Sequence, residues 1–173
     1  EQMSEVQINS VILAFSGGQI QSVVNRSSVP IRHAGVGISF EDTREVSRMA
    51  KAITLPPERG VIHTIPQLFY IDDCDPVEKP LGLFGQRLAL DMLILHVLEN
   101  RVHNTVNVVR DLNIEVADVV FGGLYAGMVA VTMAQKENGV VVIDLGGGTT
   151  DYTAYTNNIV ASVGSLAVGG DHV

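Results

Sequence analysis

The start of the chain alternates apolar and polar residues with the period of two that is typical of a β-strand. This pattern covers Val6–Phe15 and resumes at Gln19–Asn25. Between the two stretches stands Ser16-Gly17-Gly18, whose glycines suit a tight turn. The pattern therefore predicts that these two strands form a hairpin.

The next segments combine one helix with two strands. From Glu41 to Ile53 the apolar residues recur three and four positions apart, the spacing of a helix with one buried face. Ser39 or Asp42 can cap this helix, and the two prolines at 56–57 lie beyond its end. Strands are predicted at Val61–Ile71 and Leu88–Leu98, with a loop rich in Pro and Gly between them. Together these elements predict an α+β unit in which a helix covers one face of an antiparallel sheet.

After residue 98 the pattern changes to an alternation of helices and strands. Helices are predicted at Glu99–Leu112 and Leu124–Gln135, and strands at Val116–Phe121 and Val140–Asp144. This order is typical of a mostly parallel α/β sheet. Two further strands, at residues 152–155 and 159–168, flank the turn Asn157-Asn158 and predict a β-meander. We therefore place a domain boundary near Leu98.

Composition and charge narrow the function classes. The chain has 173 residues, 46% of them hydrophobic, and a net charge of −8. An acidic balance argues against nucleic-acid binding, which needs clustered Lys and Arg. No apolar segment is long enough to span a bilayer, and no signal sequence opens the chain. Cys74 is the single cysteine, so an intrachain disulfide is impossible. These features are typical of a soluble intracellular domain.

The sequence VVVIDLGGGTTD, residues 140–151, is the strongest chemical signal. Glycines have no Cβ, so they can take positive φ and bring backbone amides close to an anion. The two threonine hydroxyls can donate hydrogen bonds, and a flanking carboxylate can hold a hydrated cation that bridges to phosphates. The residues predicted to bind nucleotide are Asp144, Gly146, Gly147, Gly148, Thr149, Thr150 and Asp151. A purely steric role for the glycine turn remains the alternative.

The strands on both sides of this turn exclude two common phosphate-binding motifs. The P-loop and the Rossmann turn both run directly into a helix. Neither GxxxxGK[ST] nor GxGxxG followed by a helix is present here. A glycine turn between two strands is instead the arrangement found in actin-like ATPases.

Several segments resemble the FtsA family of bacterial cell-division proteins. Residues 139–173 are similar to its second phosphate-binding segment. VIHTIPQLFYIDD (residues 61–73) and PVEKPLGLFGQRLALDMLILHV (residues 76–97) resemble its pattern of two long strands joined by a P-x-G-x-x-G-x-R-L connection. INSVILAFSGGQIQS (residues 8–22) resembles its opening strand pair. Nearly the whole chain is covered.

The resemblance implies a fold and a division into domains. The fold class is α+β / α/β, an SHS2-like sheet-plus-helix unit followed by part of an actin-like, ribonuclease H-like domain. Residues 1–98 would be the interaction subdomain 1C, and residues 99–138 the returning part of subdomain 1A. Residues 139–173 would begin subdomain 2A with the second phosphate-binding turn.

The resemblance also implies partners, cofactors and a location. FtsA proteins are adaptors that link FtsZ to the membrane and recruit later divisome proteins at the cytoplasmic face of the division site. Other FtsA subunits and later divisome proteins would contact the 1C unit, with Arg87 as a candidate contact residue. FtsZ and the membrane would contact segments outside this sequence. ATP and Mg²⁺ are the implied cofactors, with Asp144 holding the cation through water.

Catalysis is not predicted. The first phosphate-binding turn of actin-like folds, a D-x-G-T-like sequence, has no counterpart here, so we expect a fragment that alone binds no ATP at micromolar strength. Where related ATPases place a water-orienting side chain, this chain has Gly122-Gly123-Leu124, which offers no base. Two alternatives remain open: an actin-fold ATPase or phosphotransferase, and a pilus-assembly adaptor of the PilM type. The sequence FGQRL, residues 84–88, favours FtsA over PilM.

Other candidate residues have plain structural readings beside the functional ones. The acidic cluster Asp72, Asp73 and Asp75 lacks the Gly and distal Glu of a calcium loop and is typical of a solvated turn. No cysteine pair or H-E-x-x-H pattern accompanies the histidines, so zinc is not predicted. Arg87 can form a salt bridge with a nearby carboxylate or contact a partner, and both readings stay open.

Overall fold

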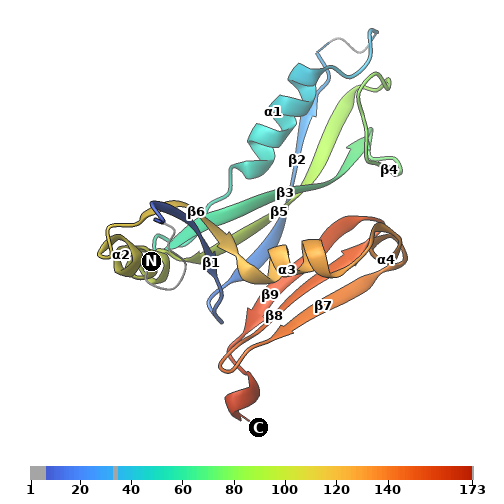
Figure 1. Cartoon of the computed structure of the whole chain (residues 1–173). Helices are drawn as coiled ribbons and strands as arrows, with labels where there is room; N and C mark the ends of the chain where they lie inside the picture. Colours follow the sequence, from blue (N-terminus) through green and yellow to red (C-terminus); the bar gives the residue numbers. More distant parts are fainter. Residues whose placement is uncertain (1–6, 33–34, 173) are drawn as a thin grey trace.

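The computed structural model describes residues 7–32 and 35–172 (Figure 1). In chain order, the strands are β1 (Ser10–Phe15), β2 (Gln21–Pro30), β3 (Arg59–Ile71), β4 (Pro76–Val77), β5 (Arg87–Leu98), β6 (Glu115–Phe121), β7 (Val140–Leu145), β8 (Thr150–Thr156) and β9 (Ile159–Leu166). The helices are α1 (Phe40–Lys51), α2 (Glu99–Arg110), α3 (Gly122–Ala130), α4 (Met133–Asn138) and the 3₁₀ turn Gly170–His172.

The first unit is an antiparallel sheet of order β2-β5-β3-β4 with α1 lying along one face (Figure 1). The predicted helix and both long strands are confirmed to within a few residues at their ends. Pro66 is tolerated inside β3 because it lies at a shift in the β3–β5 register, where the ladder of hydrogen bonds is interrupted.

A capping box fixes the start of α1. The Ser39 hydroxyl accepts from the Asp42 amide, and the Asp42 carboxylate accepts from the Ser39 amide at 2.9 Å and the Ser39 hydroxyl at 2.6 Å. Asp42 is buried, and the hydrogen bond from the Ser39 hydroxyl lowers the pKa of its carboxyl group. Each residue thus satisfies a polar group that the helix end would otherwise leave unpaired.

The predicted hairpin at the start of the chain is wrong. β1 pairs in parallel with β6, from Ser10 opposite Glu115 to Phe15 opposite Phe121, whereas β2 pairs with β5. Val6, where the predicted first strand began, lies outside the described residues. The turn Ser16-Gly17-Gly18 therefore carries the chain from one sheet to another. The first unit is inserted between the two strands of the β1–β6 pair.

The last part of the chain is the predicted meander, but the preceding helix and sheet differ from the prediction. β7, β8 and β9 form a three-stranded antiparallel sheet of their own, so β6 and β7 do not share a parallel sheet. The predicted helix Leu124–Gln135 is two helices, α3 and α4, separated where Thr132 caps α4. Val131 has an extended backbone and Thr132 forms a capping box with Gln135, so one helix ends and a second begins at this point.

Two hydrophobic clusters share strand β5. One, between the sheet and α1, contains Val29, Ile31, Ile38, Val46, Ala50, Leu88, Leu90, Met92 and Ile94. The other, between the opposite face of the sheet and the rest of the chain, contains Phe15, Ile20, Leu93, Leu95, Val97, Phe121, Leu124 and Val163. Because successive residues of a strand point to opposite faces, β5 contributes alternately to both clusters.

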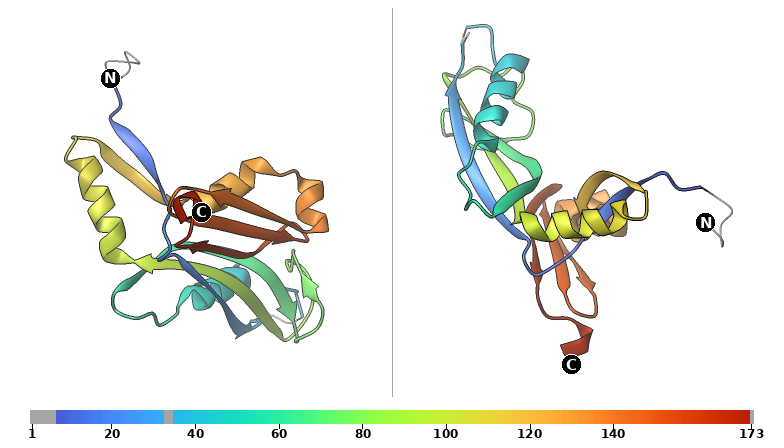
Figure 2. Two further views of the ribbon diagram at one scale, coloured as in Figure 1. Left: turned by 90° about the horizontal axis from the view of Figure 1, so that it is seen from below. Right: turned by 90° about the vertical axis from the view of Figure 1, so that its left-hand side faces the viewer.

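The three-stranded sheet β7-β8-β9 meets the four-stranded sheet of the first unit (Figures 1 and 2), and polar contacts link the two sheets there. The Ser22 hydroxyl donates to the Val163 carbonyl at 2.7 Å, and the Gln67 side-chain amide donates to the Val160 carbonyl at 2.7 Å. On β3, Nε2 of His63 accepts a hydrogen bond from the Phe121 amide at 3.0 Å. His63 thereby links the first unit to the end of β6.

This hydrogen bond predicts a pH-dependent stability. Nε2 can accept only while the ring is neutral, and burial lowers the pKa of His63 in the folded state below its ordinary 6.5. A lowered folded pKa stabilises the protein above pH 6.5, and this stabilisation is lost as the pH falls through the folded pKa. We expect the free energy of unfolding to decrease on acidification from about pH 8 to about pH 5, as measured by urea denaturation.

The His63→Gln variant should show a weaker decrease, because glutamine can accept a hydrogen bond but does not titrate. His103→Gln is the matched control, since His103 is exposed on α2. An unchanged pH dependence in His63→Gln would contradict the assignment.

Candidate functional site

The predicted glycine turn is the loop between β7 and β8. It is closed at its base by the Gly146 amide, which donates to the Thr149 carbonyl at 2.9 Å. None of the three glycines has a positive φ, so the left-handed conformation anticipated from the sequence is not what requires them. The structure shows instead that the backbone of residues 169–171 comes close to the loop.

Three consecutive amides of the loop are available to a ligand. The N–H groups of Gly147, Gly148 and Thr149 have no acceptor among the residues that the structure describes. A Cβ on Gly148 would meet nothing within 4 Å, so this side of the loop is open. Successive unpaired amides form the kind of anion-binding concavity that holds phosphates.

A second glycine turn, at residues 169–171, forms hydrogen bonds with carbonyl groups of the loop. The Gly170 amide donates to the Gly146 carbonyl, and the Asp171 amide to the Gly147 carbonyl, both at 2.9 Å. A Cβ on Gly169 would lie 2.3 Å from the Gly147 carbonyl oxygen and 2.4 Å from that of Gly146. Only glycine fits there without displacing the loop.

The two predicted carboxylates lie opposite each other, in different environments. Asp144 of β7 pairs with Asp151 of β8, so both side chains stand on the same face of the sheet. Asp144 is exposed, whereas Asp151 is buried and accepts a hydrogen bond from the Ser165 hydroxyl. Asp144 is therefore the carboxylate free to hold a hydrated cation. No cluster of three or more metal-ligating side chains is found within residues 7–32 and 35–172.

The two threonines also differ. The Thr150 hydroxyl donates its hydrogen to the Val168 carbonyl at 2.6 Å, which ties the loop to the segment after β9. The Thr149 hydroxyl makes no hydrogen bond with a described residue and remains free to donate to a phosphate. Thr150 thus supports the loop, and Thr149 can contact a ligand.

The start of α3 packs closely against this sheet. Thr153 of β8 is fully buried, and its hydroxyl donates to the Gly123 carbonyl at 2.9 Å. A Cβ on Gly123 would lie 2.9 Å from Cβ of Asp151, so the helix approaches the strand through its glycine. No sequence pattern pointed to Thr153 or Ser165, because neither belongs to a motif and each acts only through its position in the fold.

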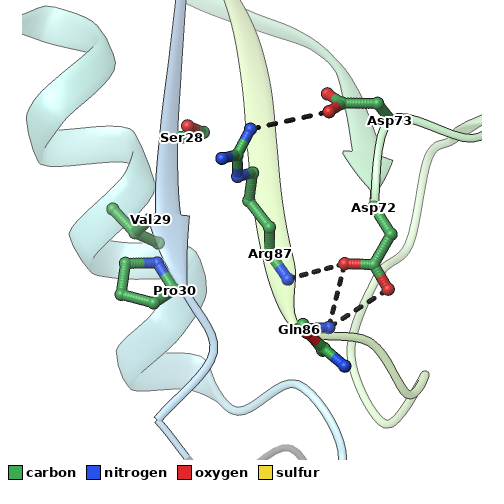
Figure 3. A pocket seen from close by; sticks show the side chains of 7 residues that line it. All are labelled: Ser28, Val29, Pro30, Asp72, Asp73, Gln86 and Arg87. Atoms are coloured by element: carbon green, nitrogen blue, oxygen red, sulfur yellow. Dashed lines mark hydrogen bonds and ion pairs between the residues drawn. The ribbon is translucent and has the colours of Figure 1, made fainter.

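Arg87 is the first residue of β5, in the four-stranded sheet, and its side chain lies beside Asp72, Asp73 and Gln86 (Figure 3). Its guanidinium is 3.5 Å from the Asp73 carboxylate, and both side chains are more than half exposed. The Asp72 carboxylate accepts the amides of Gln86 and Arg87, at 2.9 and 2.8 Å for its shorter contacts. This fixes the start of β5. An open pocket of about 780 Å³ lies here, lined by these residues and by Ser28, Val29 and Pro30 of β2.

The remaining candidates have structural roles or none. His63 and His96 each accept a hydrogen bond, from the Phe121 amide and from Nε of Arg59 respectively. Asp72 is occupied with backbone amides, which explains one member of the acidic cluster. Cys74 is exposed.

Both the matching family model and the similar proteins named below concern FtsA. Residues 17–96 match the family described as the SHS2 domain inserted in FtsA. Over all 173 residues the chain is 31% identical to cell division protein FtsA of Pseudomonas aeruginosa, 32% to that of Escherichia coli and 27% to that of Bacillus subtilis. It spans 41%, 41% and 39% of the length of these relatives.

Among solved structures, a PilM-PilN type IV pilus biogenesis complex contains a chain with the same fold. It superposes with a TM-score of 0.58 over 97% of this chain and 45% of the other, at 14% sequence identity. The mixed sheet-and-helix architecture predicted from the sequence is thus confirmed. No described helix is long and apolar enough to cross a membrane.

The packing of the two glycine turns predicts that two similar substitutions change stability by different amounts. Gly169→Ala should lower the free energy of unfolding by about 1–3 kcal/mol, because the new Cβ collides with two loop carbonyls. Gly148→Ala, in open space without a positive φ, should change stability by less than about 0.5 kcal/mol. Urea denaturation of both variants checks this, and equal losses would contradict the described packing.

Proposed function

We propose that this chain is part of a cell-division adaptor. It is similar to FtsA over its whole length, and residues 17–96 match the SHS2 domain of that family. In this role the parent protein links FtsZ to the membrane and recruits later divisome proteins. It works at the cytoplasmic face of the membrane at the division site. FtsZ and the membrane are contacted by segments that the longer relatives have beyond the region matched here.

The observation that carries this proposal is the insertion itself. The whole segment that matches the SHS2 family, residues 17–96, lies between β1 and β6 in the sequence, and these two strands pair side by side. An inserted unit with its own hydrophobic cluster leaves the surrounding fold intact and presents a separate surface. A surface of this kind suits recruitment of other proteins better than it suits chemistry.

The SHS2 domain is the proposed contact with other FtsA-type subunits and with later divisome proteins. At its far end Arg87 and Asp73 form a long, exposed ion pair, which contributes little to stability. Each partner of the pair can therefore exchange its neighbour for an opposite charge on another protein. Asp72 holds the Arg87 backbone in place, so the side chain is presented from a fixed strand.

The glycine loop is the proposed half of an ATP site. The amides of Gly147, Gly148 and Thr149 would hold a phosphate, and Asp144 would hold Mg²⁺ through water. Gly122 and Gly123 offer no side chain that could act as a base at the start of α3. Nucleotide therefore acts as an assembly switch in this proposal, and rapid turnover is not expected.

A second candidate is an adaptor for pilus assembly of the PilM type. The shared fold with a chain of the PilM-PilN complex favours it, although at 14% identity this likeness concerns the fold alone. An actin-fold phosphotransferase is the third possibility, and the glycines at the start of α3 speak against it.

The test uses the longest polypeptide that contains this chain, with purified FtsZ and ATP. We expect ATP-dependent polymers that co-sediment with FtsZ, and a loss of ATP binding of at least about tenfold in Asp144→Ala, since the cation bridge is removed. Asp75→Ala, an exposed carboxylate far from the loop, is the control. Rapid ATP turnover without FtsZ binding would replace the adaptor by the phosphotransferase.

The exposed ion pair gives a separate prediction. Arg87→Ala should weaken self-association of the same polypeptide, measured by analytical ultracentrifugation, while changing its free energy of unfolding by less than about 1 kcal/mol. Arg48→Ala is the matched control, because Arg48 is also an exposed arginine paired with a carboxylate, Glu45. Equal effects of the two substitutions would remove Arg87 from the proposed interface.

A further inference from the structure

A second pocket of the SHS2 domain combines apolar walls with two nitrogen donors. It lies where the chain leaves α1, between the loop at residues 52–56 and strand β2, and has a volume of about 500 Å³. Its apolar wall includes Val23, Ile53 and Leu55. Val23 is 41% exposed, which leaves a hydrophobic side chain open to the pocket.

Arg59 and His96 form the polar end of this pocket. Nε of Arg59 donates to Nδ1 of His96 at 2.6 Å, and its Nη2 donates to the Gln19 carbonyl at 2.6 Å. Because Nδ1 accepts, the neutral ring of His96 must carry its hydrogen on Nε2. Burial and the charge of Arg59 both lower the pKa of His96, which keeps the ring neutral.

The Nε2–H group of His96 is a donor that a ligand can reach. His96 is only 7% exposed, yet no described residue accepts a hydrogen bond from its Nε2. The Nε2 atom itself is reached by solvent, so either water or an acceptor supplied by a ligand can take this hydrogen bond. The Arg59 guanidinium beside it adds a positive charge, and Nη1 makes no hydrogen bond with a described residue.

The charge of the pocket is opposite to that of the chain. The protein as a whole has 19 acidic and 11 basic residues, but no carboxylate lines this pocket. The site therefore complements a ligand group that is negative and accepts hydrogen bonds. Its apolar wall complements an aliphatic group next to that acceptor.

The strand that borders the pocket selects the kind of ligand. β2 is the outer strand of the four-stranded sheet, and its residues Gln21, Val23 and Asn25 line the pocket. The outer edge of a strand can pair with an added extended peptide. We propose that this pocket binds an extended peptide segment of a partner protein, in which a Glu or Asp carboxylate contacts Arg59 and His96 and a neighbouring aliphatic residue contacts Val23 and Leu55.

This inference rests on the proposed role of the SHS2 domain in binding other proteins and names the chemistry of one such partner. It is independent of the Arg87 surface. Arg87 lies at the far end of β5 from His96, so the two sites can be tested separately.

The test compares two peptides on the unmodified chain. Acetyl-Leu-Glu-Leu-amide is the probe, and acetyl-Leu-Gln-Leu-amide is the matched control without the charge. NMR titration should show binding of the first peptide with a dissociation constant on the order of 1 mM, as suits a ligand of this size. We expect the second to bind at least about fivefold more weakly, since a charge-assisted hydrogen bond is lost. The imidazole signals of His96 and the amide signals of residues 21–25 should shift.

Variants then test the contacts. Arg59→Gln should abolish the preference for the Glu peptide, whereas Arg26→Gln, an arginine of β2 paired with Asp91, should leave it unchanged. If Arg59→Gln does not fold, the comparison of the two peptides on the unmodified chain still decides. Equal affinity for both peptides, or no shift at His96 with the Glu peptide at about ten times the expected dissociation constant, would overturn the proposal. If the longer polypeptide still binds FtsZ in that case, the adaptor role stands and only this site is lost.

Discussion

The structure depends on one strand that is buried on both faces. Along β5 the residues Leu88, Leu90, Met92 and Ile94 pack against α1, while Leu93, Leu95 and Val97 pack against Phe15, Phe121 and Val163. A strand between two cores cannot slip in register without exposing one of the two apolar sets. β5 therefore fixes the first unit, whose sequence matches the SHS2 family, against the rest of the chain, and it holds Arg87 and His96 near its opposite ends.

The same packing reaches the glycine loop through a short series of contacts. Phe121 is fully buried beside β5, and the helix that follows it approaches β8 through Gly123. Thr153 and Asp151 of β8 are in turn held by hydrogen bonds to the Gly123 carbonyl and the Ser165 hydroxyl. The loop between β7 and β8 is thus mounted on a sheet whose position is set by the core. Its exposed amides are presented from a supported backbone, which is what a binding loop requires.

Sequence patterns predicted the elements well and their partners poorly. Periodicity located α1, both long strands of the first unit and the meander, because each pattern reflects burial of one local face. The pairing of β1 with β6 left no local signal, since the partners are separated by the whole inserted domain. The composition of the glycine loop predicted the loop itself, but it did not predict which of its residues support the loop and which are free to bind a ligand. Thr150 and Asp151 differ from Thr149 and Asp144 only through contacts with Val168 and Ser165, which are distant in sequence.

The parallel pair β1–β6 has a consequence for how the chain acquires its structure. Bringing Phe15 beside Phe121 closes a very long loop, and the entropy lost is recovered only when both strands have something to pack on. The inserted domain, whose α1 and β2–β5 contacts are nearer in sequence, can supply that surface first. During synthesis on the ribosome, β1 therefore stays unpaired until β6 has been made, while the inserted domain can already fold.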